Sequence, residues 1–452
     1  MKHRFLPHSF SLSACRLVGL FLVCASLFAA ELPRRAWFGA GFQPIDDSTR
    51  AVIGDSAGAR LVNLVDGGPA QAADLQMGDI VRRIGGQPIH TGPQVSALIK
   101  NEHRPGETVH VELWRNGERM TKDVALVEWP RESDDEFDVV YEAFEMDGAL
   151  RRMIITKPSR EGTFPTVFIF GGLGCYSLDG GPAALDPYVQ ILYALTRAGF
   201  ATVRIEKTGM GDSQGKPCAE QDFDYEVHGL VTGMQYAATL PYVDRSNLII
   251  FGHSMGGFTG PVAAREYPVK GIVAMATSAI GWFEYMLTNQ RRQLVLEGLP
   301  YDSVEKAQIE AEKAFHLHYV ELKPLDEILA EHPDYINYLQ APAHYTFMQD
   351  VANLNIADVW KHVDAKVLFV YGSSDFITAR DEHLYGVELV NSFHPGNAEY
   401  AEIDDLDHYF TRVPDQKASF DNVVAGLPNK EMNRDCIPVI VNWCKKTVGK
   451  GT

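Results

Sequence analysis

The stretch Leu248–Ala264 limits the possible folds more than any other part of the sequence. It begins with four apolar residues, Leu248–Phe251, which is the pattern of a short strand buried on both faces. A run rich in glycine and alanine follows from Gly256 and can form a helix. Ser254 lies between the two segments. The sequence therefore predicts a strand, a sharp turn and a helix, with one small polar side chain at the corner.

Residues 252–256 form the pattern G-x-S-x-G in this setting. In a strand-turn-helix context the pattern is typical of a nucleophile elbow, in which a strained turn exposes the serine hydroxyl at the carboxyl edge of a sheet. The two glycines leave room for the neighbouring backbone. A serine of this kind requires an acid and then a histidine further along the chain.

Strand and helix patterns alternate around this corner. A β-hairpin is expected over 138–158, about the turn Asp147-Gly148. Apolar strands are expected at 166–170, 201–206, 248–251, 271–276, 366–372 and 399–403, and helices at 187–200, 224–240, 256–267 and 437–446. Buried strands between amphipathic helices indicate an α/β fold with a mostly parallel sheet covered on both faces. The long interruption at 282–361, rich in helix formers and aromatic residues, is predicted to be a helical lid.

Two polar residues at strand ends meet the requirement that Ser254 sets. Asp375 follows the strand 366–372, and His408 follows the strand 399–403. Open parallel sheets gather their sites in such loops. With these features, residues 138–450 resemble the α/β-hydrolase fold, in particular bacterial esterases and serine aminopeptidases. The resemblance implies that Ser254 is the nucleophile, that His408 is the general base and acid, and that Asp375 orients His408. The alternatives for the acid and the base are His383, His394, Asp404, Asp405 and Asp407.

The same resemblance implies an oxyanion hole. The backbone amide of Met255 would supply one donor. The second would come from the loop after the strand 166–170, whose sequence FGGLG resembles the His-Gly-Gly-x-Gly motif with Phe170 in place of histidine. Gly172 is the expected second donor, and Leu173 is its alternative. The hydroxyl of Tyr176 is a further candidate.

Four of the six cysteines lie beyond residue 30, which allows three pairings. Cys436 and Cys444 are eight residues apart in an expected helix, a rise of about 12 Å that a disulfide does not span. Among the other pairs, we prefer a disulfide between Cys175 and Cys218. It would tie the loop 206–218 to the oxyanion loop and hold the donors in place.

Residues 36–128 resemble a PDZ domain of the bacterial, protease-associated type. The matching segments are AWFGAGF at 36–42, the stretch 58–89 with GGPAQAADLQMGDIV, and GPQVSALIKN at 92–101. The resemblance implies a small β-rich domain whose groove binds the C-terminal end of a peptide. An empty groove that serves folding or dimer contacts is the alternative. The implied groove residues are Trp37, Phe38, Gly39, Ala40, Phe42, Val95 and Leu98. The acidic, proline-containing stretch 129–137 is predicted to be a solvated linker.

Residues 1–30 have the layout of a secretory signal peptide, with Lys2 and Arg4 before an apolar run that ends in small residues. An uncleaved anchor is the alternative. We therefore expect a periplasmic or secreted protein. The net charge of the chain is −18, which disfavours binding to nucleic acid or to anionic lipid beyond the signal segment.

No metal or cofactor is expected, because the sequence lacks H-E-x-x-H and clustered Cys/His spacings. The histidines of the predicted lid are isolated instead: His316, His318, His332 and His344. The sequence thus predicts an exported serine hydrolase that cleaves small-molecule carboxylic esters through an acyl-enzyme. One alternative is a serine peptidase acting on peptides captured by the PDZ domain. The other is a non-catalytic PDZ adaptor with a vestigial triad.

Overall fold

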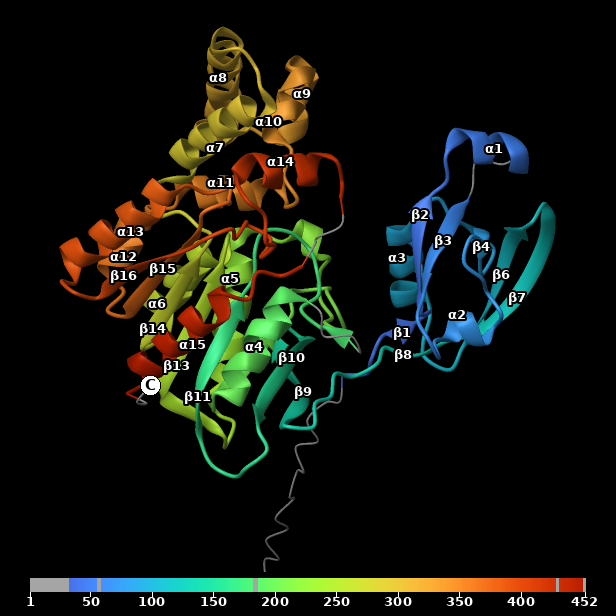
Figure 1. Cartoon of the computed structure of the whole chain (residues 1–452), viewed down its shortest axis with the longest axis horizontal. Helices are drawn as coiled ribbons and strands as arrows, with labels where there is room; N and C mark the ends of the chain where they lie inside the picture. The colour runs from blue at the N-terminus through green and yellow to red at the C-terminus, as the bar shows by residue number, and fades with distance from the viewer. Residues whose placement is uncertain (1–31, 55–57, 182–185, 428–430, 450–452) are drawn as a thin grey trace, which may run out of the picture. The chain divides into compact units, whose positions relative to one another are not determined.

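The computed structural model describes residues 32–54, 58–181, 186–427 and 431–449 (Figure 1). The predicted signal segment, 1–30, lies outside the described residues. Among the residues that are described, no helix is long and apolar enough to cross a membrane.

The N-terminal part is rich in antiparallel strands, as expected of a PDZ domain. β1 (Ala36–Trp37) pairs with β8 (Val127–Glu128). The other strands form one sheet in the order β2-β3-β4-β6-β7, with β5 beside β4. They are β2 (Ala40–Pro44), β3 (Ala59–Leu64), β4 (Ile80–Ile84), β5 (Gln87–Pro88), β6 (Thr108–Arg115) and β7 (Glu118–Ala125). The helices are α1 (Asp47–Ile53), α2 (Pro69–Ala72) and α3 (Gly92–Glu102). A capping box of Thr91 and Gln94 fixes the start of α3.

The C-terminal part contains an eight-stranded sheet in the order β16-β15-β14-β13-β11-β12-β10-β9. The first six strands of this order run parallel, and the expected hairpin of β9 and β10 adds two antiparallel strands. The strands are β9 (Phe137–Met146), β10 (Ala149–Pro158), β11 (Phe164–Phe170), β12 (Ala201–Ile205), β13 (Val243–His253), β14 (Gly271–Met275), β15 (Lys366–Gly372) and β16 (Ala398–Ile403).

Helices cover both faces of this sheet, which explains the uninterrupted apolar runs of its central strands. Ile250 belongs to one core cluster with residues of α5 and α6, whereas Phe251 belongs to another with residues of α4 and α15. Figure 1 shows α4 and α15 side by side over the sheet. These helices and their neighbours are α4 (Pro187–Arg197), α5 (Phe223–Ala237), α6 (Gly256–Glu266), α12 (Ile356–Lys361), α13 (Arg380–Phe393), α14 (Gln416–Val424) and α15 (Cys436–Thr447).

The insertion predicted at 282–361 is helical, and its first helices gather at one end of the sheet in Figure 1. It contains α7 (Trp282–Glu297), α8 (Tyr301–Phe315), a π-helical turn at His316–Val320, α9 (Leu325–Glu331), a short turn at Pro333–Tyr335, α10 (Ile336–Leu339) and α11 (Tyr345–Asn353). Both α7 and α11 contribute residues to the cavity described below.

The prediction that residues 129–137 form a solvated linker is wrong for Glu132, whose exposed fraction is 4%. The carboxylate of Glu132 makes two hydrogen bonds with the guanidinium of Arg204 on β12, at 2.6 and 2.8 Å. Burial would raise the pKa of Glu132, but the charge of Arg204 keeps it below the ordinary value. The acidic pattern of the stretch predicts solvation only where no buried cation lies nearby.

Candidate active site

Ser254 occupies the sharp turn between β13 and α6, with φ of 54°. This is the left-handed region, which costs free energy for a residue other than glycine. The neighbouring glycines are required sterically. A Cβ on Gly252 would lie 2.3 Å from the carbonyl oxygen of Gly256, and a Cβ on Gly256 would lie 2.0 Å from that of Phe170. The G-x-S-x-G pattern therefore reflects the close packing of this turn.

The structure brings Ser254, His408 and Asp375 together. His408 Nε2 lies 3.1 Å from Ser254 Oγ, and His408 Nδ1 lies 2.9 Å from Asp375 Oδ2. Because a carboxylate only accepts hydrogen bonds, Nδ1 carries the proton and Nε2 is free to accept the serine proton.

Asp375 is completely buried in the turn after β15. Its Oδ1 accepts hydrogen bonds from the amides of Ile377 and Thr378, and its Oδ2 accepts one from the Thr378 hydroxyl. Burial would raise the pKa of Asp375, but the charge of His408 and these hydrogen bonds lower it to about 2. The carboxylate is therefore ionised at neutral pH.

The alternative residues have other partners. The ring nitrogens of His383 contact the backbone of Ala379 and Thr277, and burial lowers the pKa of His383 to about 4. Asp407 accepts hydrogen bonds from two amides of its own loop and from Ser419. Within the described part of the chain, no hydrogen bond joins Ser254 to His394, Asp404 or Asp405.

The candidate oxyanion donors lie beside Ser254. Gly172, Leu173 and Met255 all line the same cavity as the serine. The amide of Gly172 donates a long hydrogen bond, of 3.4 Å, to the hydroxyl of Tyr188. The hydroxyl of Tyr176 donates to the carbonyl oxygen of Gly172 at 3.2 Å, so its proton is directed away from the site.

A disulfide and a buried lysine hold this loop. The predicted bond between Cys175 and Cys218 is present, with Cα atoms 5.8 Å apart, and the buried Cys436 and Cys444 are free. Lys207 Nζ donates to the carbonyl oxygens of Gly172 and Gly174, at 3.1 and 3.0 Å. The sequence analysis missed Lys207, whose only signal is its position directly after the strand at 201–206.

His253, the second residue of the motif, was also missed. Its Nε2 lies 3.0 Å from the backbone carbonyl oxygen of His408, so Nε2 carries a proton. Burial, followed by the charge of His408, lowers the pKa of His253 to about 3. The ring is therefore neutral, and its Nδ1 accepts a hydrogen bond from the Tyr188 hydroxyl at 2.6 Å. Tyr188 thus connects the oxyanion loop to the loop of His408.

The cavity at Ser254 measures about 440 Å³ and is largely apolar. The polar side chains that line it, other than those of Ser254 and His408, are neutral. Among the described residues, no Asp, Glu, Lys or Arg lines it. No group of three or more His, Cys, Asp or Glu in the described chain is arranged to hold a metal ion. The main apolar walls are Phe258, Trp282, Tyr285, Met286, Met348 and Ile377.

A second cavity of about 430 Å³ lies along β1, β2 and α3. Five of the predicted groove residues line it: Trp37, Phe38, Gly39, Ala40 and Val95. The prediction is wrong for Phe42 and Leu98, which do not line this cavity. Ile99 of the same helix does line it, as Val95 does.

Two families of known proteins match parts of the chain. Residues 176–412 match the family described as "Serine aminopeptidase, S33", and residues 37–126 match the family described as "PDZ domain". The solved structure of Est1E from Butyrivibrio proteoclasticus with ferulic acid is similar, with 15% identity and a TM-score of 0.45, covering 68% of this chain and 98% of that one.

Two curated relatives resemble the chain over different lengths. Esterase EstD of Thermotoga maritima is 25% identical over 294 residues, 65% of each chain. A probable periplasmic serine endoprotease DegP-like of Pseudomonas savastanoi pv. phaseolicola is 27% identical over 165 residues, 36% of this chain and 34% of that protein. The chain thus spans about a third of the length of that DegP-like protein. Since the first family match covers more than half of its residues, the chain belongs to the serine aminopeptidase S33 family of α/β-hydrolase-fold serine hydrolases and carries an N-terminal PDZ domain.

Proposed function

We propose that this protein is an exported esterase that hydrolyses small, uncharged carboxylic esters with Ser254, His408 and Asp375. The observation that carries the proposal is the neutral cavity beside Ser254. It offers about 440 Å³ of mainly apolar space, which suits an acyl or alcohol group without charge.

The reaction follows from the hydrogen bonds of the three residues. Ser254 Oγ attacks the ester carbonyl carbon as its proton passes to His408 Nε2. The amides of Met255 and of Gly172 or Leu173 stabilise the oxyanion. The intermediate collapses, and the alcohol leaves with the proton from His408, which gives an acyl-enzyme. Water then attacks the acyl carbon, gives its proton to His408, and releases the acid as Ser254 regains its proton.

Asp375 supports these steps electrostatically. Its ionised carboxylate holds the proton of His408 on Nδ1 and stabilises the imidazolium that forms in each transition state. Because its pKa is about 2, this support persists throughout the neutral range.

Peptide hydrolysis is the second candidate, since the description of the family names an aminopeptidase and the chain carries a PDZ domain. An aminopeptidase must bind the α-ammonium group of its substrate. A buried cation is costly without an anionic partner. Among the described residues that line the cavity there is no aspartate or glutamate. The ester is therefore favoured. A purely adaptor role is disfavoured by the hydrogen-bonded triad.

Export and the PDZ ligand belong to the same proposal. The Cys175–Cys218 disulfide is typical of oxidising compartments, and relatives that match about a third of the chain are named as probable periplasmic endoproteases. The groove lined by Trp37–Ala40 and Val95 is proposed to bind the C-terminal end of a peptide.

Two matched substrates test the reaction. The p-nitrophenyl esters of propionate and of alanine differ by one ammonium group. We expect kcat/KM to be at least about tenfold higher for the propionate, because the cavity offers that cation no partner. Ser254→Ala should abolish both activities. A preference for the alanyl ester, together with rapid cleavage of alanyl p-nitroanilide, would favour the peptidase.

A further inference from the structure

The loop 172–181, which contains the candidate oxyanion donors Gly172 and Leu173, has no helix or strand before Gly181. Within the described chain, the backbone groups of this loop that form hydrogen bonds bind side chains and not other backbone groups. Its conformation therefore depends on those side chains. The bound groups are the amides of Gly172, Leu178, Asp179, Gly180 and Gly181 and the carbonyls of Gly172, Gly174 and Leu178.

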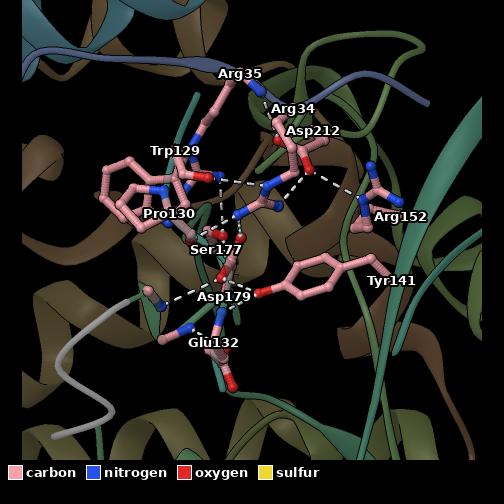
Figure 2. Close-up of polar contacts among 12 residues, drawn as sticks. Arg34, Arg35, Trp129, Pro130, Glu132, Tyr141, Arg152, Ser177, Asp179 and Asp212 are labelled. Atoms are coloured by element: carbon pink, nitrogen blue, oxygen red, sulfur yellow. Dashed lines mark hydrogen bonds and ion pairs between the residues drawn. The ribbon is translucent and has the colours of Figure 1, made fainter. Parts of the chain in front are cut away.

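Two of the side chains that hold this loop come from the segments that flank the PDZ domain. Arg34, just before β1, donates to Asp179 Oδ2 at 2.7 Å and to Asp212 Oδ2 at 2.5 Å (Figure 2). Glu132, just after β8, accepts a hydrogen bond from the amide of Gly180 at 2.7 Å.

The two flanking segments are also joined to each other. The guanidinium of Arg34 donates to the carbonyl oxygens of Trp129 and Pro130, at 3.2 and 3.1 Å. Tyr141 on β9 completes the cluster in Figure 2, because its hydroxyl accepts from the amide of Glu132 and donates to Asp179 Oδ1.

These contacts join charged side chains that are buried from solvent. Arg34 and Glu132 are 2% and 4% exposed, and Asp179 and Asp212 are less than a tenth exposed. If either flanking segment moved away, buried charges of the loop would lose their partners. The arrangement therefore fixes residues 177–181 in one position.

The fixed segment is connected to the oxyanion donors by a short path. Ser177 Oγ accepts from the amide of Asp179 and donates to Glu206 Oε1 at 2.5 Å. The residue after Glu206 is Lys207, whose ammonium group holds the carbonyls of Gly172 and Gly174. Glu206 and Lys207, which directly follow β12, thus bind both ends of the loop.

We propose that Arg34 and Glu132, which lie outside the α/β-hydrolase part of the chain, are positioning residues for the oxyanion loop. The inference rests on the proposed esterase function, in which this loop supplies a donor to the transition state. The connections of the PDZ domain thereby complete the active site, in contrast to a free hinge between two independent units.

The test uses the full chain and a neutral ester. We expect Arg34→Gln to lower kcat about tenfold with KM within about twofold, because an oxyanion donor acts mainly in the transition state. The inhibition constant of a boronic acid, which mimics the tetrahedral intermediate, should rise by a similar factor. Arg34→Lys retains the charge and should recover part of kcat.

Arg197→Gln is the matched control. Arg197 binds Asp134 and Glu136 of the same connecting segment but does not contact the loop 172–181. Its kcat and boronic acid affinity should equal those of the wild type. A loss of kcat as large as that of Arg34→Gln would overturn the proposal, because any disturbance of the connecting segment would then lower kcat.

Tyr141→Phe covers the case in which Arg34→Gln does not fold. It removes the hydroxyl between Glu132 and Asp179 without changing a charge, and we expect kcat to fall about two- to fivefold at constant KM. The proposal is overturned if Tyr141→Phe and every folded Arg34 variant keep the wild-type kcat and boronic acid affinity. If instead Ser254→Ala retains the wild-type rate, it is the proposed function that fails.

Discussion

The imidazole of His253 donates a hydrogen bond through Nε2 to the backbone carbonyl oxygen of His408, at 3.0 Å. The residue before the candidate nucleophile therefore holds the candidate general base by its main chain. Since Nδ1 of the same ring accepts from Tyr188, whose hydroxyl also faces the amide of Gly172, one neutral chain of hydrogen bonds joins the general base to the oxyanion loop.

The first prediction concerns Tyr188. Tyr188→Phe removes the hydroxyl that donates a hydrogen bond to His253 Nδ1, and it leaves that nitrogen buried without a donor. We expect kcat on a neutral ester to fall about tenfold and unfolding free energy to fall by about 1–3 kcal/mol. Tyr236→Phe, whose hydroxyl contacts Glu142, is the control and should keep the wild-type kcat. An unchanged kcat for Tyr188→Phe would show that this chain does not position His408.

The second prediction concerns stability in acid. The pKa of His253 is about 3 in the folded protein and about 6.5 when unfolded. The unfolded chain therefore binds more protons between these values, and the stability that neutral His253 contributes is lost as the pH falls below about 6.5. The slope is at most about 1.4 kcal/mol per pH unit. Urea unfolding of wild type and His253→Phe at pH 7 and pH 5 should show the wild type losing more. An equal loss of unfolding free energy in both proteins would contradict the low pKa of His253.

The third prediction distinguishes the acids near His408. Asp375→Asn should lower kcat about 10⁴-fold, because an amide can place the imidazole proton on the wrong nitrogen. Asp407→Asn is the control, since Asp407 binds only its own loop and Ser419. It should change kcat by less than about threefold while lowering the melting temperature. The reverse ranking would identify Asp407, in the loop of His408, as the acid of the triad.

Much of the catalytic part could be predicted from local patterns. The apolar runs of β11, β13 and β15 identify buried parallel strands, and their ends fix where Ser254 and Asp375 must lie. The disulfide between Cys175 and Cys218 could be predicted only in part, because the geometry of one helix excludes a bond between the other two cysteines but does not choose among the remaining pairs.

The contacts between distant segments could not be predicted. Glu132 sits in an acidic stretch that predicts solvation, and its burial depends on Arg204, 72 residues later in the chain. Arg34 lies between the predicted signal segment and the motifs of the PDZ domain, and neither pattern includes it. Leu98 shows a smaller limit of the same kind, because three apolar residues of α3 are buried and their spacing does not tell which of them line the groove.

The fourth prediction concerns the disulfide. Replacing Cys175 and Cys218 together by serine should lower kcat more than it raises KM, because the loop that is freed carries a donor used chiefly in the transition state. Replacing the free Cys436 by serine is the control for cysteine loss. It should reduce stability without a selective fall in kcat. Equal effects of the double variant on kcat and 1/KM would mean that the disulfide supports substrate binding instead.

The last prediction tests whether the neutral cavity sets the preference between esters. Gln340 lines the cavity at its exposed edge, and its neighbour Asn337 on α10 is exposed and does not line it. Gln340→Glu should raise the ratio of kcat/KM for the alanyl over the propionyl ester about threefold at low salt, through attraction between the new carboxylate and the substrate ammonium. Asn337→Asp adds the same charge outside the cavity and should leave the ratio unchanged. The gain should shrink in about 0.5 M salt, because exposed charges are screened. If both variants raise the ratio equally, the overall charge of the lid, and not the lining of the cavity, determines which ester is preferred.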